Sequence, residues 1–233
     1  MSTPKPALLA LEDGSIFRGL AFGANAAIAG ECVFNTSMTG YQEILTDPSY
    51  AGQIVTMTAA QIGNYGVARA DVEARAPMVA GFIVRSESPI ASNWRADGTL
   101  RDYLTARGIV AISDIDTRAL TRLLRSSGVM RGVIATGAPD PDALVAKARA
   151  LPQMEGLDLV KGVTCAAPFD WTPPADDPDY VVPAERQPRR RLKIAAYDYG
   201  MKWNILRRFT AYGCDVRVFP ALTPAADVLA TKP

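Results

Sequence analysis

The chain has 233 residues, 48% of them hydrophobic, which is long for one small domain and short for two complete ones. Its net charge of +1 gives no reason to expect nucleic acid or an anionic membrane surface as a partner, and no apolar run approaches the roughly 20 residues of a membrane span. The chain contains no histidine, so neither a Ser-His nor a Cys-His pair can be assembled from these residues.

The cysteines and the first residues narrow the cellular context. Cys32, Cys165 and Cys214 are odd in number and far apart, so they form neither a disulfide framework nor a zinc-binding spacing. The first six residues contain no apolar segment of the kind that a secretory signal needs. A cytoplasmic location is therefore expected.

The chain is predicted to begin with a β-hairpin. Residues 7–11 are typical of an apolar strand, Asp13-Gly14 is a tight-turn signal, and residues 16–22 form the returning strand. β-branched or apolar content predicts further strands at residues 31–36, 53–58, 78–84 and 133–136.

Helices are predicted at residues 99–107, 114–125 and 141–150. Gly108 closes the first, and Asp114 or Asp116 can cap the second, which carries a leucine stripe. The third begins with Asp140-Pro141, a cap residue followed by proline in the first turn. Mixed strands and helices after an opening hairpin indicate an α+β domain over residues 1–152.

The composition changes after Pro152. Residues 153–192 show little periodicity and end in Arg189-Arg190-Arg191, which predicts a Pro-rich linker or a surface-wrapping segment. The arginine run is short and the chain is nearly neutral, so a solvated linker end is favoured over a nucleic-acid patch. Six prolines interrupt the range: Pro168, Pro173, Pro174, Pro178, Pro183 and Pro188.

Residues 193–233 begin a different pattern. Two predicted buried strands, at residues 192–197 and 214–220, flank a helix at residues 201–212 that Gly213 ends. This is a βαβ unit, normally parallel and right-handed. Because a parallel sheet needs more than two strands, the domain is expected to be incomplete, with an unpaired strand edge, and the chain to be the first part of a longer protein.

The stretch from Gly30 to Tyr50 is the most informative part of the chain. An apolar strand containing Val33 and Phe34 breaks into a run dense in hydroxyls, amides and carboxylates. Loops of this composition commonly hold polar ligands, because the scaffold fixes them while their donors stay free. Within it, Ser49 follows Asp47-Pro48, a stiffened turn, and on chemistry alone a local turn hydrogen bond is the favoured role of Ser49.

The acidic residues nearby do not form a predicted catalytic pair. Glu31, Glu43 and Asp47 span a strand and a loop, so no common face can be assigned to them. Solvated or hydrogen-bonding roles are favoured over general acid catalysis.

The cysteines are not predicted to be nucleophiles. Cys32 and Cys214 lie at predicted strands without a glycine-rich turn or a neighbouring base, so both are interpreted as core residues. Cys165 lies in the linker, where it is expected to be more exposed, and nothing near it in the sequence would lower its pKa.

Nucleotide-binding motifs are missing from the sequence. A dinucleotide fingerprint would need three spaced glycines after the strand at 192–197, and Asp198-Tyr199-Gly200 supplies only Gly200. That glycine is interpreted as easing a strand-to-helix turn. A phosphate-binding loop of the type G-x-x-x-x-G-K-[ST] is also missing.

Several segments, in order along the chain, resemble the small subunit of carbamoyl-phosphate synthetases. The match covers nearly the whole chain apart from the linker, and it is most specific over residues 35–50 and 114–125. The matching segments are Leu11–Gly14, Gly30–Tyr50, Ile62–Gly66, Ile90–Trp94, Gly108–Ile112, Asp114–Arg125 and Tyr197–Ile205. The Ala60-Gln61 pair departs from that family, which often has Pro or His near this point.

The resemblance implies an α+β N-terminal domain that packs on a large synthetase subunit. It implies that this domain is followed by the first βαβ unit of an incomplete α/β class I glutamine amidotransferase domain. Such subunits free ammonia from L-glutamine and pass it inside the complex to the large subunit. That subunit makes carbamoyl phosphate from bicarbonate and ATP for pyrimidine and arginine synthesis. No cofactor is expected in this chain, since ATP and Mg²⁺ belong to the large subunit.

The resemblance carries one ligand contact onto this sequence, that of Ser49 with glutamine. The family's catalytic cysteine, histidine and glutamate fall in segments beyond Pro233, so no catalytic residue and no metal ligand is expected here. This chain alone is expected to be inactive. Two other classes stay open: a non-catalytic module that docks on a large synthetase subunit, and half of a nucleotide-binding oxidoreductase domain, against which the missing glycine fingerprint counts.

Overall fold

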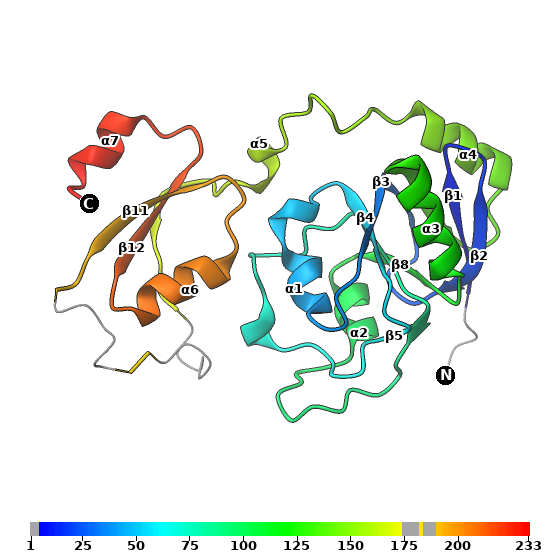
Figure 1. The fold of residues 1–233 in the computed structure, drawn as a ribbon, viewed down its shortest axis with the longest axis horizontal. Coiled ribbons are helices and arrows are strands. Elements are labelled where there is room, and N and C mark those ends of the chain that lie inside the picture. Colours follow the sequence, from blue (N-terminus) through cyan, green and yellow to red (C-terminus); the bar gives the residue numbers. More distant parts are fainter. Residues whose placement is uncertain (1–4, 174–181, 184–189) are drawn as a thin grey trace.

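The computed structural model describes residues 5–173, 182–183 and 190–233, which form a larger N-terminal part and a smaller C-terminal part along the long axis (Figure 1). The larger part is a closed barrel with the strand order β1-β2-β8-β6-β4-β3-β9. Its strands are β1 (Pro6–Leu11), β2 (Ile16–Ala21), β3 (Ala27–Asn35), β4 (Gln53–Met57), β6 (Gly81–Ile83), β8 (Val110–Ser113) and β9 (Met130–Thr136). A short parallel pair, β5 (Gln61–Ile62) and β7 (Ser86–Glu87), lies outside the barrel sheet.

The barrel combines two kinds of pairing. β1 pairs antiparallel with β2 and with β9, so the first and last strands close the sheet. β3, β4, β6 and β8 run parallel to one another in that order. The helices that connect or follow strands are α1 (Tyr41–Thr46), α2 (Leu100–Ala106), α3 (Thr117–Ser127) and α4 (Pro141–Ala150), with single 3-10 turns η1 (Pro48–Tyr50) and η2 (Arg69–Asp71).

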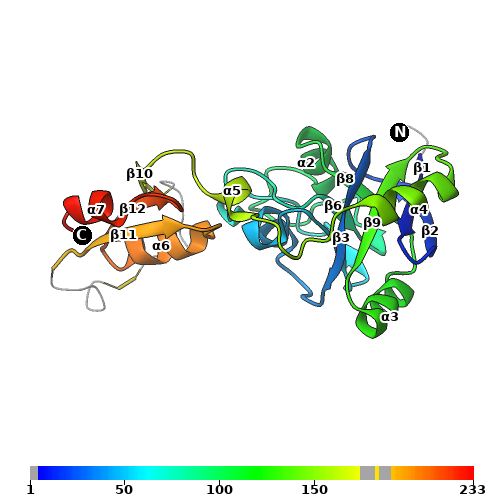
Figure 2. The same cartoon turned by 90° about the horizontal axis from the view of Figure 1, so that it is seen from above.

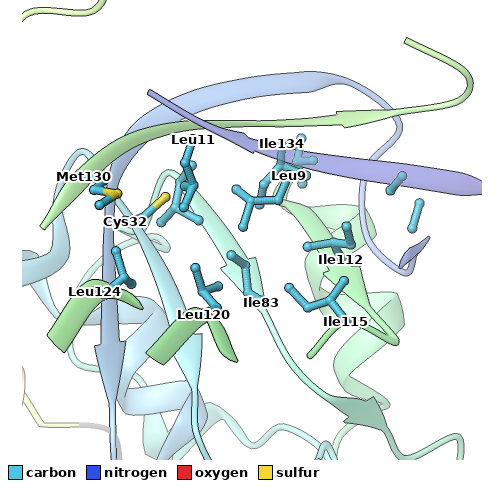
Figure 3. Close-up of a cluster of buried hydrophobic side chains, with 14 residues drawn as sticks. Leu9, Leu11, Cys32, Ile83, Ile112, Ile115, Leu120, Leu124, Met130 and Ile134 are labelled. Atoms are coloured by element: carbon cyan, nitrogen blue, oxygen red, sulfur yellow. The ribbon is translucent and has the colours of Figure 1, made fainter. Parts of the chain in front are cut away.

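The alternation of side chains along β1 explains why nearly the whole strand is buried. Leu9 and Leu11 point into a cluster inside the barrel, while Leu8 and Ala10 pack against α4 on the outer face. Figure 3 shows the inner cluster, in which Leu120 and Leu124 of α3 lie opposite Leu9, Leu11 and Ile134; Cys32 and Ile83 lie between them. Helix α3 thus closes the barrel interior.

A second cluster lies on the other side of the parallel strands. There α1 and α2 cover the outward-facing residues of β4, β6 and β8, as Figure 1 shows from one side. Its fully buried members include Tyr41, Leu45, Phe82, Leu100 and Leu104. The sheet is therefore apolar on both faces over its parallel section, as such sheets usually are.

The smaller part is a three-stranded sheet with the order β10-β12-β11. Its strands are β10 (Phe169–Asp170), β11 (Lys193–Asp198) and β12 (Asp215–Pro220); its helices are α6 (Trp203–Ala211) and α7 (Ala225–Ala230). β11 and β12 are parallel, and Leu206 of α6 packs on Cys214, Val216 and Val218. Helix α5 (Val160–Val163) lies between the two parts, as Figure 2 shows.

Several sequence predictions are confirmed. The opening hairpin, the helix capped by Thr99 and ended near Gly108, the helix that starts after Asp140, and the parallel βαβ unit are all present. The α+β class of the N-terminal part is also confirmed.

Other predictions were wrong in detail. The strand predicted at residues 31–36 already begins at Ala27, and the strand predicted at 78–84 covers only Gly81–Ile83. Residues 41–50, predicted to be a loop, fold as α1 and η1, because Tyr41 and Leu45 find a buried face that local composition does not reveal. Neither β8 nor α7 was predicted.

The C-terminal part also differs from its prediction. The range 153–192, interpreted as a linker, contains α5 and β10, and β10 pairs with β12, so β12 is flanked on both edges. β11 is half-buried and not fully buried as predicted. Arg189 and the prolines at 174, 178 and 188 lie outside the described residues; Arg191 pairs with Asp215 at 2.6 Å.

Candidate functional site

Ser49 lies on a single 3-10 turn that its neighbours fix. Asp47, with extended backbone, caps η1 by accepting a hydrogen bond from the Ser49 N–H at 2.9 Å, and Pro48 is the first residue of the turn. The turn hydrogen bond expected from the sequence is therefore made by the backbone of Ser49. Its side chain is exposed, and within the described residues its hydroxyl has no hydrogen-bond partner. That hydroxyl can donate to a ligand and accept from one.

The second carboxylate oxygen of Asp47 reaches the C-terminal part. Asp47 Oδ2 lies 2.9 Å from Lys202 Nζ, with the Asp47 side chain 11% and the Lys202 side chain 48% exposed. The hydrogen bond to Asp47 raises the pKa of Lys202 above its usual value, so Lys202 is a cation at neutral pH. Because Asp47 also accepts the Ser49 N–H, this one carboxylate places the exposed Ser49 hydroxyl near the half-exposed ammonium group of Lys202.

The turn after β11 comes close to this carboxylate. Gly200 has φ +94°, and a Cβ atom there would lie 3.1 Å from Pro48 Cβ and 3.0 Å from Val163 Cγ2. Asp198 Oδ1 accepts the N–H groups of Gly200 at 2.9 Å and Met201 at 2.8 Å, which shapes the turn. Gly200 is thus needed both for its backbone conformation and for close approach. We call residues 47–50 and 198–202 together the junction site.

Other polar residues between Gly30 and Tyr50 hydrogen-bond to one another and to Tyr65 beside the junction site. Asn35 Nδ2 donates to the Tyr50 hydroxyl at 2.9 Å, and Asn35 Oδ1 accepts the Ser37 N–H at 2.7 Å. Tyr41 stacks on Tyr65 with ring centroids 4.1 Å apart, and the Tyr65 hydroxyl accepts the Tyr41 N–H at 3.1 Å. These contacts tie the polar stretch to its neighbours, and the exposed Ser49 hydroxyl is available to a ligand.

The three carboxylates that the sequence singled out do not converge. Glu31 Oε2 accepts a hydrogen bond from Gln53 Nε2 at 2.8 Å, whereas Asp47 accepts the Ser49 N–H in the junction site. Glu43 is half-buried, and its Oε2 has no hydrogen-bond partner among the described residues. Burial raises the pKa of Glu43 above its ordinary value. Within those residues no group of three metal-ligating side chains occurs.

The cysteines are placed as core or boundary residues. Cys32 is buried inside the barrel, where desolvation raises its pKa to about 12. Cys214 is 5% exposed beneath α6. Cys165 is partly buried, its pKa is raised first by desolvation and then by Asp198, and its N–H donates to Asp198 Oδ2 at 2.7 Å. Cys32 and Cys165 therefore stay protonated at neutral pH and are poor nucleophiles.

Glu73 is a residue of this region that sequence reasoning missed. Its backbone carbonyl accepts the Trp203 N–H at 2.9 Å, and its Oε2 accepts the Asn204 N–H at 2.8 Å. Its own N–H donates to Thr46 Oγ1 at 2.8 Å. The available signal was indirect: Lys202 precedes α6, and Lys is a poor N-cap, so the first N–H groups of that helix need acceptors from elsewhere.

The junction site offers binding chemistry without a catalytic pair. An exposed hydroxyl and an ammonium group suit the polar ends of a small ligand, such as a carboxylate or an amide. The described parts of the chain include no helix long and apolar enough to cross a membrane.

Residues 9–134 match the family described as carbamoyl-phosphate synthase small chain, CPSase domain. A carbamoyl phosphate synthase small chain of Syntrophotalea carbinolica is 54% identical over 228 residues, covering 97% of this chain and 60% of that protein. The carbamoyl phosphate synthase small chain of Pseudomonas aeruginosa is 51% identical, and the match covers 98% of this chain and 61% of that protein. The small chain of Thioalkalivibrio sulfidiphilus is 49% identical, and the match covers 98% of this chain and 60% of that protein. The chain thus spans about 60% of the length of these relatives.

Proposed function

Since the chain belongs to the carbamoyl-phosphate synthase small chain family, we propose that it forms part of a glutamine-hydrolysing small subunit. In this proposal the small subunit frees ammonia from L-glutamine. A large synthetase subunit uses that ammonia with bicarbonate and ATP, and with Mg²⁺, to make carbamoyl phosphate. The complex works in the cytoplasm, and its product serves pyrimidine or arginine synthesis.

The observation that carries the proposal for this chain is the free hydroxyl of Ser49. It lies on the turn that Asp47 caps and Pro48 stiffens, and the second carboxylate oxygen of Asp47 lies 2.9 Å from Lys202 Nζ. A fixed, unused donor at the edge of a βαβ unit is suited to orient a polar substrate. We assign to it one contact with glutamine, and we assign no chemical step to any residue of this chain.

The assignment is tested with Ser49→Ala in the complete small chain assembled with its large subunit. A hydrogen bond to a charged group contributes about 1.5–3 kcal/mol, so the glutamine KM should rise by about one to two orders of magnitude. Synthesis driven by added ammonia bypasses glutamine and reports the integrity of the complex. The matched control is Ser127→Ala, which removes another exposed serine, at the end of α3. An unchanged glutamine KM in Ser49→Ala would remove Ser49 from the site.

The 233 residues by themselves are expected to release no ammonia from glutamine. Attack on a carboxamide needs a thiolate, a base and oxyanion donors; the chain has no histidine, the pKa values of Cys32 and Cys165 are raised, and Cys214 is buried. Ammonia is assayed with the purified chain, with and without the large subunit. Turnover that Cys214→Ser abolishes would contradict this expectation and the structural role of Cys214.

A non-catalytic docking module is the second candidate, and the absence of histidine favours it for this chain taken alone. The two candidates differ in one measurement. A docking module binds the large subunit but has no need of glutamine, so its Ser49→Ala variant would behave like wild type in every assay.

A further inference from the structure

Glu73 is a buried carboxylate at the boundary between the two parts of the molecule. It is 6% exposed, lies two residues after η2, and makes hydrogen bonds to both parts. Figure 1 shows α6 beside the barrel on the side of α1. Burying a carboxylate is costly unless its oxygens are satisfied, so its contacts indicate what it does.

On the side of the C-terminal part, Glu73 caps helix α6. The first N–H groups of a helix have no acceptor within the helix, and the side chain of Lys202, at the N-cap position, supplies none. Glu73 accepts two of them, Trp203 N–H at its carbonyl oxygen and Asn204 N–H at Oε2. One turn further along α6, Arg207 Nη1 donates to the Val72 carbonyl oxygen at 2.9 Å.

On the barrel side, Glu73 is tied to the end of α1. Its N–H donates to Thr46 Oγ1, and Thr46 directly precedes Asp47. Asp47 in turn accepts from Lys202, the residue that precedes α6. The contacts therefore form a ring that runs from Glu73 through α6 and Lys202 to Asp47, and back through Thr46.

We propose that Glu73 is a positioning residue that holds the start of α6, and with it Lys202, against the turn that carries Ser49. The charged groups that face Glu73 include Lys202 and Arg207 of the C-terminal part, and Asp47 and Glu43 of the barrel. Its relevance to glutamine rests on the proposed function. The contact between Glu73 and α6 does not depend on that function, so the contact and its effect on glutamine binding can be tested separately.

The first test uses the chain as it stands and measures hydrogen exchange of the amides in residues 202–206. Glu73→Ala should speed exchange at the start of α6 by about 2- to 30-fold, the factor that loss of one helix cap represents. Glu73→Gln keeps a carbonyl oxygen and should exchange like wild type. Glu43→Gln, which neutralises a neighbouring half-buried carboxylate without touching α6, is the matched control. Equal exchange in Glu73→Ala and wild type would overturn the proposal.

The second test measures the glutamine KM and kcat of the same variants in the complete small chain with its large subunit. Glu73→Ala should raise KM by about 2- to 30-fold with a smaller change in kcat, because a displaced Lys202 disturbs binding. Glu73→Gln should restore the wild-type KM, and Glu43→Gln should leave it unchanged. Equal losses in the Ala and Gln variants would overturn the positioning role. A wild-type complex without glutamine-dependent synthesis would overturn the proposed function while leaving the exchange result in force.

Discussion

A single carboxylate, that of Asp47, serves both sides of the junction site. One oxygen caps the turn that carries Ser49 and the other pairs with Lys202. Removing it would release both groups together, so effects of Asp47 and Lys202 variants should not be additive. At the scale of residues, the site is a small network that leaves the Ser49 hydroxyl and the half-exposed Lys202 ammonium group accessible to a ligand.

Glu43 should make the protein less stable as the pH rises. Burial raises its pKa, so the folded state holds the proton more tightly than the unfolded state does, and stability falls as the pH rises through the interval between the two pKa values. Glu43→Gln cannot ionise and should raise the Tm by about 1–3 °C at pH 8, with no gain near pH 4. Thermal unfolding at both pH values checks this, with the exposed Glu155→Gln as control. A Tm gain of equal size at both pH values would contradict it.

Sequence reasoning placed some residues well and could not place others. Cys32 and Cys214 were assigned to the core because they lie at predicted strands without a glycine-rich turn or a neighbouring base, and they are buried. Glu73 was not found, because its partners are the amides of a helix 130 residues further on, and no local pattern reports such a contact. The roles of buried polar residues depend on tertiary contacts more than those of apolar residues do.

The helices of the barrel are defined by their caps. Asp116 Oδ1 accepts the Ala119 N–H at 2.9 Å and starts α3, whereas Asp114, the other cap candidate, has φ 60° and lies before the helix. Thr99 and Asp140 start α2 and α4 in the same way. The sequence signals differed among the three helices: Gly108 ends the first, a cap with a leucine stripe marks the second, and Asp140-Pro141 begins the third.

The two aspartates before α3 should respond to substitution in opposite ways. Asp116→Ala should lower the free energy of unfolding by about 1 kcal/mol, because an N-cap is lost. Asp114→Gly should be neutral or stabilising, since glycine tolerates positive φ and the Asp114–Arg85 pair, 3.8 Å apart and more than half exposed, contributes little. Urea unfolding measures both. A larger loss for Asp114→Gly than for Asp116→Ala would show that the helix starts earlier.

Short elements without a cap residue or a clear apolar pattern were not predicted correctly. Helix α1 has six residues and a glycine, Gly40, at its N-cap position, so hydroxyl-rich composition outweighed its short apolar face. β8 has four residues, all buried, between two helices, and β11 was predicted to be more deeply buried than it is. Short elements depend on their neighbours for stability, which a single sequence does not display.

At the scale of the molecule, residues 1–152 should fold without the rest. The three clusters of the barrel use residues between Ala7 and Ala148, and Arg131 donates to the Leu151 carbonyl and to Glu12, which ties that segment down. A fragment of residues 1–152 should unfold in one cooperative transition by circular dichroism and co-purify with the large subunit. Binding that also requires residues 190–233 would contradict the proposed docking role of this domain.

The α+β class was predictable, but closure of the barrel was not. Class follows from the kinds of element and their order, which local patterns report. Closure depends on β1 pairing with β9, where Leu8 lies opposite Ala135, and each strand by itself is equally suited to an open sheet. Likewise, β10 has two residues, and only its pairing with β12 marks it as a strand.

The pairing of β1 with β9 has a consequence for biosynthesis. The hairpin leaves the ribosome well before its partner strand, which follows more than a hundred residues later, because Leu8 is matched with Ala135. At about 5–20 residues per second, Leu8, Leu9 and Leu11 wait on the order of ten seconds for their final neighbours. During translation this nascent segment exposes apolar side chains on both faces, so we expect ribosome-associated chaperones to engage it before the barrel is complete.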